Sequence, residues 1–276
     1  MVLSLDQRLN NELKEIATKV RRILEETLPT AKKPEKLYQA STHLIKAGGK
    51  MLRPYLVVKS CEAVGGDEES ALPVAVAIEL LHTFTLIHDD ILDNDKVRRG
   101  VPSVHVKWNI PLAIIAGDLL FTNVFKTITD GLKAKKIQSQ KIIESVGVIT
   151  ETAVAICEGQ TLDMEFSMKE DVSEEEYMVM ISKKTACLFR AGAEMGALMG
   201  GGSEFQRDKL GTFAEYSGMA LQIADDVLGL VADEEELGKP VGSDLREGKK
   251  SLPIIDALRK ADQNQKAKNL FHDSFL

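Results

Sequence analysis

Residues 72–92 read LPVAVAIELLHTFTLIHDDIL, a run of apolar and small residues that closes on acidic ones. The run is long enough for a membrane span. However, it holds Glu79 and His82 and ends at Asp89 and Asp90, which a span of about 20 residues seldom tolerates. A helix that is apolar on all sides and does not span a membrane is buried in a protein interior. The stretch therefore predicts a core helix and no membrane span.

The rest of the chain continues the helical pattern. Between residues 5 and 28, leucine, isoleucine and valine recur at spacings of three and four, which is typical of an amphipathic helix ended by Pro29. Ser173 and Glu176 form a capping-box pattern that predicts a helix start. No segment shows convincing strand alternation, and no Asn-Gly hairpin signal occurs. We predict an all-α fold, a single-domain helical bundle over residues 1–276.

Composition limits the class of protein. The chain has 35 Lys and Arg against 42 Asp and Glu, a net charge of −7, whereas nucleic-acid binders usually carry a basic face. Cys61, Cys157 and Cys187 form no CxxC pair, so neither a disulfide framework nor a zinc cluster is predicted. No signal peptide follows Met1. We expect a cytoplasmic protein that binds no nucleic acid.

Two apolar segments deliver clustered aspartates. Asp89, Asp90 and Asp93 close the first, and on a helix they lie within about 100° of one another and share a face. Asp225 and Asp226 close the second. Neighbouring carboxylates repel one another unless a cation lies between them, and Mg²⁺ takes one or two carboxylates together with substrate phosphates. If the two helices face each other, these acids would hold several divalent ions.

Basic residues accompany both acidic segments. They are Arg98 and Arg99 after the first, the lysines of residues 238–253 after the second, and Lys50 and Arg53 in a glycine-framed segment. Glycines let the backbone approach an anion, and Arg and Lys bind phosphate oxygens. Taken singly, each acid pair is explained by a solvated helix end and each cation by a surface charge. Together they predict a site for two phosphate-bearing ligands bridged by magnesium.

These motifs resemble those of the trans-isoprenyl diphosphate synthases, and most closely the archaeal-type geranylgeranyl diphosphate synthases. Five motifs occur in the family's order: Gly-Gly-Lys-x-x-Arg-Pro at 48–54, Asp-Asp-x-x-Asp with Arg-Arg-Gly at 89–100, Lys-Thr at 184–185, Gln-x-x-Asp-Asp at 222–226 and Gly-Lys-Pro-x-Gly-x-Asp-Leu-x-x-Gly-Lys at 238–249. The resemblance implies a deep central apolar cavity and a homodimer. It also implies Mg²⁺-dependent head-to-tail condensation of isopentenyl diphosphate with an allylic diphosphate, giving geranylgeranyl or farnesyl diphosphate.

The resemblance assigns roles to individual residues. Isopentenyl diphosphate is expected to be held by Lys50, Arg53, His82 and Arg99. The metal ions are expected on Asp89, Asp93 and Asp225, with support from Asp90 and Asp226. The allylic diphosphate is expected among Arg98, Lys184, Thr185, Gln222, Lys239 and Lys249. The five aspartates and Lys184 are expected to be catalytic.

Two assignments have a structural alternative of similar weight. Phe84 and Thr85 lie about one turn before the first aspartate motif, where the family places the floor of its cavity. A large ring followed by a small residue resembles the enzymes that stop at geranylgeranyl diphosphate, but Phe84 is explained almost as well by core packing. A lone histidine on an apolar helix is usually a core residue, yet His82 lies two turns before Asp89 on a similar face.

Two departures from the family pattern leave an alternative function open. Gly229 stands where the second motif usually has a third aspartate, and the domain is expected to be short at its C-terminus. Both leave room for a non-catalytic or weakly active partner subunit. Such subunits typically have degraded aspartate motifs, whereas the first motif here is intact. A class I terpene cyclase would carry Asn/Asp-x-x-Ser/Thr-x-x-x-Glu, which the sequence lacks. We therefore expect an active prenyltransferase.

Overall fold

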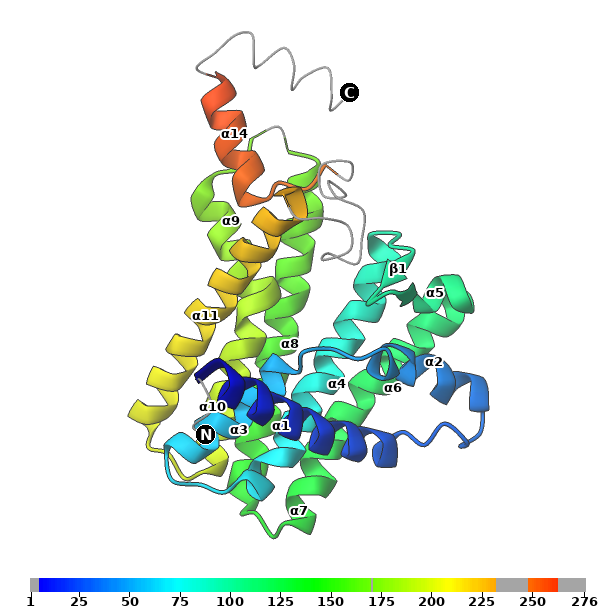
Figure 1. The fold of residues 1–276 in the computed structure, drawn as a ribbon, viewed down its shortest axis with the longest axis vertical. Helices are drawn as coiled ribbons and strands as arrows, with labels where there is room; N and C mark the ends of the chain where they lie inside the picture. Colours follow the sequence, from blue (N-terminus) through cyan, green and yellow to red (C-terminus); the bar gives the residue numbers. More distant parts are fainter. Residues whose placement is uncertain (1–4, 170, 232–247, 263–276) are drawn as a thin grey trace. The chain divides into compact units, whose positions relative to one another are not determined.

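The computed structural model describes residues 5–169, 171–231 and 248–262, and most of these lie in helices (Figure 1). In chain order the elements are α1 (Leu5–Thr27), α2 (Glu35–Lys46), α3 (Leu52–Ala63), α4 (Glu68–Leu92), β1 (Val97–Arg98), β2 (Val101–Pro102), α5 (Val104–Lys107), α6 (Ile110–Lys126), the π-helix η1 (Thr127–Gly131), α7 (Leu132–Ala134), α8 (Ser139–Ser167), α9 (Glu174–Ile181), the π-helix η2 (Ser182–Ala186), α10 (Cys187–Met199), α11 (Glu204–Val231) and α14 (Leu252–Asp262). The all-α prediction is confirmed.

The described residues form two compact units. Unit 1 takes residues up to Glu151 together with Leu188–Ala214, and unit 2 takes Thr152–Cys187 together with residues from Glu215 onward. The boundary falls within α8, α10 and α11, so each of these helices contributes residues to both units. The single domain expected from the sequence stays a prediction.

Helix α4 is the centre of unit 1 and packs against α3 and α6 (Figure 1). Its N-cap Asp67 accepts a hydrogen bond from the backbone N–H of Ser70, and residues 71–81 are all buried. By length and composition, α4 and residues 110–134 are each long and apolar enough to cross a membrane, with 72% and 39% of their most apolar windows buried. The predicted core helix is therefore confirmed for residues 72–92.

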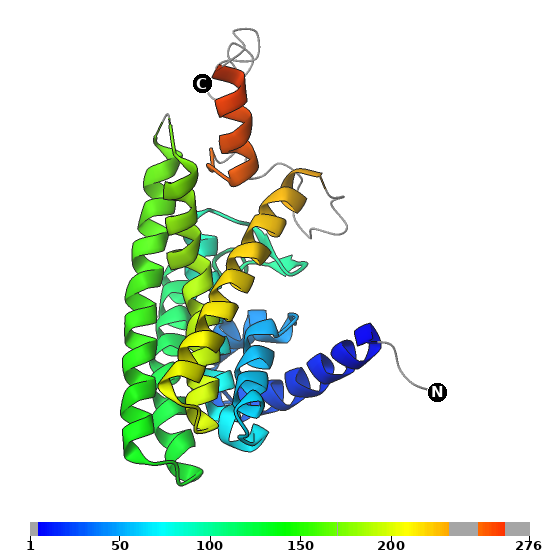
Figure 2. The same ribbon diagram turned by 90° about the vertical axis from the view of Figure 1, so that its left-hand side faces the viewer.

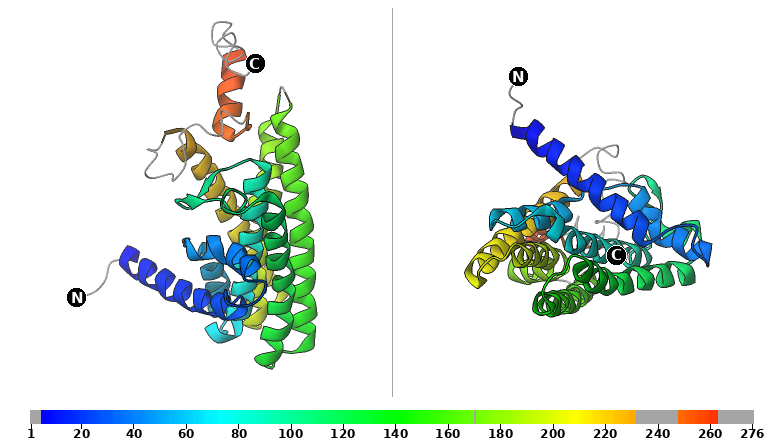
Figure 3. Two further views of the ribbon diagram at one scale, coloured as in Figure 1. Left: turned by 90° about the vertical axis from the view of Figure 1, so that its right-hand side faces the viewer. Right: turned by 90° about the horizontal axis from the view of Figure 1, so that it is seen from below.

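A short hairpin joins α4 to α5 (Figure 3). Val97 pairs with Pro102 and Arg98 with Val101, and the two turn residues, Arg99 and Gly100, have φ of +55° and +73°. Positive φ at both central residues is the signature of a type I′ turn, which matches the twist of hairpin strands. The sequence does not predict this hairpin, because two-residue strands are too short to alternate and the turn is Arg-Gly.

Unit 2 has a small hydrophobic core of its own. Phe166, Val172, Tyr177, Met180, Ile181 and Ile255 form a buried cluster. The predicted capping box at the start of α9 is confirmed, with Ser173 and Glu176 exchanging side-chain and backbone hydrogen bonds. Helix α14 packs against α9 (Figure 2), so the residues that follow the second aspartate motif in the chain return to the same core.

Close packing of α3 and α10 generates a prediction for stability. A Cβ added to Gly196 on α10 would lie 2.1 Å from the carbonyl oxygen of Val57 on α3, whereas one added to Gly147 on α8 meets nothing within 4 Å. We expect Gly196→Ala to lower the free energy of unfolding by about 1–3 kcal/mol through overpacking. Gly147→Ala should raise it by about 0.5–1 kcal/mol. Urea denaturation of both variants tests this, and equal shifts would contradict it.

Candidate functional site

The first aspartate motif lies at the C-terminal end of α4. Asp93 caps the helix, and its backbone N–H donates to the carbonyl of Asp89 at 2.8 Å. Both side chains are partly buried and lie one turn apart. Negative side chains are unfavourable at the negative end of the helix dipole, and the last turn of α4 has no basic residue. Cations from elsewhere are therefore needed to offset the charge of this helix end.

Asp90 has a different environment because it is completely buried. Its Oδ1 accepts a hydrogen bond from Arg98 Nε at 2.7 Å, and Arg98 Nη2 also contacts Asp95 Oδ2 at 2.7 Å. Burial raises the pKa of Asp90 to about 6, although Arg98 acts in the opposite direction. The shared face expected for the three aspartates thus holds for Asp89 and Asp93, while Asp90 lies in the interior with Arg98 as its partner.

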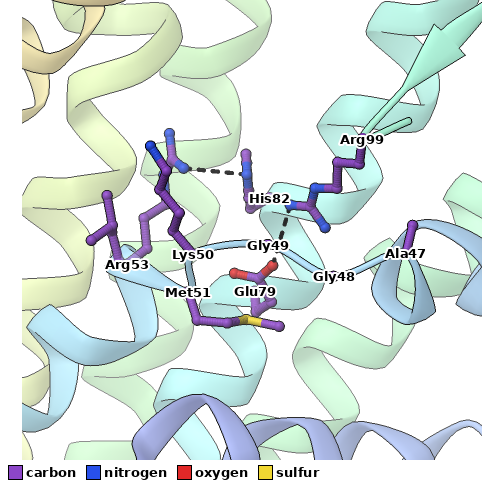
Figure 4. A pocket seen from close by; sticks show the side chains of 10 residues that line it. Ala47, Gly48, Gly49, Lys50, Met51, Arg53, Glu79, His82 and Arg99 are labelled. Atoms are coloured by element: carbon purple, nitrogen blue, oxygen red, sulfur yellow. Dashed lines mark hydrogen bonds and ion pairs between the residues drawn. The ribbon is translucent and has the colours of Figure 1, made fainter. Parts of the chain in front are cut away.

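The four residues expected to hold isopentenyl diphosphate come together in one pocket (Figure 4). The pocket has a volume of about 530 Å³ and is lined by Ala47, Gly48, Gly49, Lys50, Met51, Leu52, Arg53, Glu79, His82 and Arg99. These residues come from the α2–α3 loop, the first turn of α3, α4 and the hairpin turn. The volume suits a small ligand, and three cationic side chains suit an anionic one.

The α2–α3 loop has an unusual backbone that presents Lys50 and Arg53 to this pocket. Gly48 and Gly49 have φ of +99° and +156°, and Met51, the N-cap of α3, is left-handed at +54°. The Arg53 guanidinium lies over the Phe189 ring, 4.3 Å from its centroid. The φ values of Gly48 and Gly49 lie where a residue with a β-carbon is strained, which explains why Gly-Gly precedes the lysine.

His82 is fixed by the same arginine. Arg53 Nη1 lies 3.2 Å from His82 Nε2. Burial first, and then the positive charges of Arg53, Arg99 and Arg98, hold the pKa of His82 well below its usual value. Because a guanidinium only donates hydrogen bonds, Nε2 is the acceptor and the single ring proton lies on Nδ1. His82 is therefore a neutral side chain with one N–H to offer.

The second aspartate motif, on α11 in unit 2, repeats the design of the first. Asp225 is exposed, whereas Asp226 is 8% exposed. The Tyr177 hydroxyl donates to Asp226 Oδ2 at 2.7 Å, and the Gln222 amide donates to Asp226 Oδ1 at 2.8 Å. The Thr185 hydroxyl donates to Gln222 Oε1 at 3.0 Å. The second aspartate of each motif is thus buried and held by side-chain hydrogen bonds, whereas the first is partly exposed (Asp89) or exposed (Asp225).

Lys184 and Thr185 lie on the π-helix η2. Lys184 Nζ forms an ion pair with Asp163 Oδ2 of α8 at 2.5 Å. The backbones approach closely here, since a Cβ on Gly159 would lie 2.3 Å from the Lys184 nitrogen. A π-turn within a helical segment is frequent at functional sites, and this one carries the Lys-Thr motif.

Three residues near the second aspartate motif are not predicted as site residues from the sequence: Tyr177, Asp163 and Gln160. The amide atoms of Gln160 are buried and have no hydrogen-bond partner in the described part of the chain. One usable signal exists, because Gln160 and Asp163 repeat the Gln-x-x-Asp spacing of Gln222 and Asp225. Tyr177 offers no signal, since an aromatic residue on an apolar helix face is indistinguishable from packing.

The remaining predicted residues fall in several places. The Phe84 ring packs against the rings of His88 and Phe121, with centroids 4.6 and 5.0 Å away, and the Thr85 hydroxyl donates to the His82 carbonyl at 2.8 Å. Lys249 lies just before α14 and is partly buried. Lys239 lies outside the described residues. The two aspartate motifs belong to different units, so their facing arrangement stays a prediction.

The residues present fit a hard divalent cation. Within residues 5–169, 171–231 and 248–262, no three acidic, histidine or cysteine side chains converge on one point. Mg²⁺ does not require such a cage, because it commonly binds through one or two carboxylates plus substrate phosphates and water. Asp89, Asp93 and Asp225 supply oxygen donors of that kind.

Comparison with known proteins gives a consistent result. The family model described as polyprenyl synthetase matches residues 34–275. The short chain isoprenyl diphosphate synthase of Methanothermobacter thermautotrophicus is 51% identical over 84% of this chain and 70% of its own length. The geranylgeranyl diphosphate synthase of Sulfolobus acidocaldarius is 48% identical over 84% and 69%. The crystal structure of geranylgeranyl pyrophosphate synthetase from Pyrococcus horikoshii superposes with a TM-score of 0.87 at 42% identity, covering 96% of this chain and 80% of that one.

The buried bond between Tyr177 and Asp226 generates a second prediction. Tyr177→Phe removes the hydroxyl that donates to a buried carboxylate, so the free energy of unfolding should fall by about 1.5–3 kcal/mol. Tyr216 on α11 is 68% exposed, and Tyr216→Phe is the matched control with no expected change. Guanidinium denaturation measures both. A Tyr177→Phe variant as stable as the control would show that the hydroxyl does not stabilise Asp226.

Proposed function

The chain belongs to the polyprenyl synthetase family, and we propose that it joins isopentenyl diphosphate head-to-tail to an allylic diphosphate, with geranylgeranyl diphosphate as the main product. The enzyme is a prenyltransferase of the short-chain isoprenyl diphosphate synthase class. The relatives described above are named as isoprenyl and geranylgeranyl diphosphate synthases. The motifs of this chain supply the aspartates, arginines and lysines that the reaction requires.

The observation that carries the proposal is the pocket around Lys50, Arg53, His82 and Arg99. These four residues are spread over 50 positions of the sequence and four structural elements, yet they line one cavity (Figure 4). Arg offers a planar fork of donors to a phosphate group, and Lys offers a point charge. The neutral His82 has one ring N–H that can donate a hydrogen bond. We assign this pocket to the diphosphate of isopentenyl diphosphate, whose negative charge is attracted by Lys50, Arg53 and Arg99.

The allylic diphosphate is assigned to the residues around the aspartate motifs. They are Arg98, Lys184, Thr185, Gln222, Lys249 and, outside the described residues, Lys239. Mg²⁺ ions held by Asp89, Asp93 and Asp225 would neutralise the diphosphate leaving group as its bond to carbon breaks. Arg98 keeps Asp90 in place, and Tyr177 and Gln222 keep Asp226 in place. The accessible aspartate of each pair is thereby held at a fixed position on its helix.

The remaining steps of the reaction require exclusion of water, positioning of the second substrate and a base. Cleavage of the allylic carbon–oxygen bond leaves a carbocation, which water would quench, so apolar side chains must exclude water. Isopentenyl diphosphate, held by its own pocket, is positioned to attack with its double bond, which lowers the entropic part of the barrier. Loss of a proton then restores a double bond, and the released diphosphate is the candidate base.

We also propose a homodimer in a reducing cytoplasm. Ile110, Ile114 and Ile115 of α6 are about half exposed, and a second copy of the chain would remove these apolar side chains from water. Cys157 is an exposed free thiol, which suits a compartment where disulfides do not form.

Elongation of labelled isopentenyl diphosphate tests the function. The purified protein, checked by sedimentation for its oligomeric state, is incubated with Mg²⁺ and separately with dimethylallyl, geranyl or farnesyl diphosphate. Products resolved by chain length should stop at geranylgeranyl diphosphate and disappear with EDTA. Asp89→Asn should lower kcat/KM by roughly 10²–10³-fold, as expected when one group that stabilises charge in the transition state is removed.

Asp171→Asn is the matched control, because Asp171 is exposed in the loop before α9. No elongation from any primer by the folded protein would overturn the proposal and favour a non-catalytic partner subunit. Elongation that survives EDTA would overturn the magnesium requirement alone.

Product length gives a separate prediction at Phe84. If the ring is the floor of the cavity, Phe84→Ala should shift the products to chains longer than geranylgeranyl diphosphate. If it only packs against His88 and Phe121, the variant should lose stability and keep its products. Chromatography and thermal unfolding separate the two. Phe205→Ala is the control, since Phe205 on α11 is 70% exposed.

A further inference from the structure

One carboxylate lies in the pocket that we assign to an anion. Glu79, one turn before His82 on α4, is 2% exposed and lines the pocket together with Lys50, Arg53 and Arg99 (Figure 4). A buried carboxylate is costly unless it has a partner, and this one would also repel a diphosphate. Neither the motifs nor the proposed reaction accounts for it.

The partner of Glu79 is Arg99. Arg99 Nη2 lies 3.8 Å from Glu79 Oε1, and Arg99 Nη1 donates to the carbonyl of Leu44 at 3.0 Å. The guanidinium also lies against Gly49, where an added Cβ would be 2.9 Å from Arg99 Cζ. Three different segments therefore surround one guanidinium and restrict where it can lie.

The backbone of Arg99 makes such restraint necessary. The residue has φ of +55° at the tip of a two-residue hairpin turn, a region that side chains with a β-carbon adopt only when the surroundings hold them there. A long side chain on a short turn would otherwise sample many positions. Contacts at its far end supply the missing constraint.

Glu79 faces several cations. Burial raises the pKa of Glu79, while Arg99, Arg53 and Arg21 lower it in that order. Arg21 reaches the pocket wall from α1, where its Nη2 donates to the carbonyl of Gly49 at 3.0 Å. The carboxylate therefore either balances the charge of this cluster or fixes the geometry of one member.

We propose that Glu79 is a positioning residue that holds the Arg99 guanidinium against Gly49, in the orientation that receives the diphosphate of isopentenyl diphosphate. The inference rests on the proposed function. A positioning role and a role in balancing the positive charge of the pocket predict opposite effects on binding. Charge balance alone predicts that neutralising Glu79 tightens isopentenyl diphosphate binding, by roughly tenfold or more for a unit charge a few ångströms away. Positioning predicts weaker binding.

Two substitutions of Glu79 separate these outcomes. If Glu79 positions Arg99, Glu79→Gln and Glu79→Asp should each raise the KM for isopentenyl diphosphate about tenfold or more. Glutamine lacks the negative charge that attracts Arg99, and the aspartate side chain is too short to reach it. The KM for the allylic diphosphate should be unchanged. A lower KM in Glu79→Gln, with Glu79→Asp like the natural protein, would overturn the proposal in favour of charge balance.

A second pair of variants acts on Arg99 without altering Glu79. Gly49→Ala places a methyl group against the Arg99 guanidinium, whereas Gly48→Ala, also at positive φ, meets nothing within 4 Å. Gly49→Ala should raise the KM for isopentenyl diphosphate clearly more than Gly48→Ala. If Gly49 and Glu79 both act through Arg99, the increase in KM of the double variant Gly49→Ala/Glu79→Gln should be smaller than the product of the increases in the two single variants. Independent, multiplying effects would contradict a shared route.

Calorimetric titration with isopentenyl diphosphate keeps this test separate from the proposed function, because it needs no turnover. If the natural protein binds no isopentenyl diphosphate, the proposed function fails. If it binds and elongates but Glu79→Gln binds equally well, the positioning role alone fails.

Discussion

The burial of α4 is the constraint on which unit 1 depends. A helix whose residues 71–81 are all buried cannot slide or rotate without exposing apolar surface. The polar side chains that it carries are therefore fixed in position along its axis. Glu79 and His82 face the cationic pocket, and Asp89 and Asp93 follow at the end of the same helix. One rigid element thus sets the spacing between the cationic pocket and the first aspartate motif, the two places that we propose for the diphosphates of the two substrates.

The two aspartates of each Asp-Asp pair have different environments, and the difference is the same in both motifs. In each, the second aspartate is buried and bonded to a protein partner, Arg98 for Asp90 and Tyr177 with Gln222 for Asp226. Buried polar groups need such partners, since an unmet hydrogen bond in the interior is costly. The pairing leaves the first aspartate of each motif accessible. In each Asp-Asp pair, the second residue therefore anchors the helix, and the first is the one that we propose as a metal ligand.

Much of the fold and the residues of one pocket could be predicted from the sequence. The apolar run at 72–92 predicts the buried helix because periodicity and length are local properties, and Gly48–Pro54 predicts an anion site because glycines and cations are adjacent there. Glu79 and Tyr177 could not be recognised in this way. Their partners, Arg99 and Asp226, lie 20 and 49 positions further along the chain, so only the folded contacts distinguish them from packing residues. The ion pair between Arg98 and Asp90 could not be predicted either, because it depends on which face of α4 is buried.

The π-helix η2 has a consequence for how the second motif is held. Tyr177 and Thr185 are eight residues apart, which in a regular α-helix places them about 80° apart around the axis. A π-turn holds more residues than an α-turn, so the angle between Tyr177 and Thr185 around the axis is smaller than 80° in this segment. Both then reach α11, one at Asp226 and the other at Gln222. Removing Ser182 or Lys183 would change this alignment and leave the Lys-Thr motif and both aspartate motifs intact. The number of residues between Tyr177 and Thr185 is therefore restricted, as well as their chemistry.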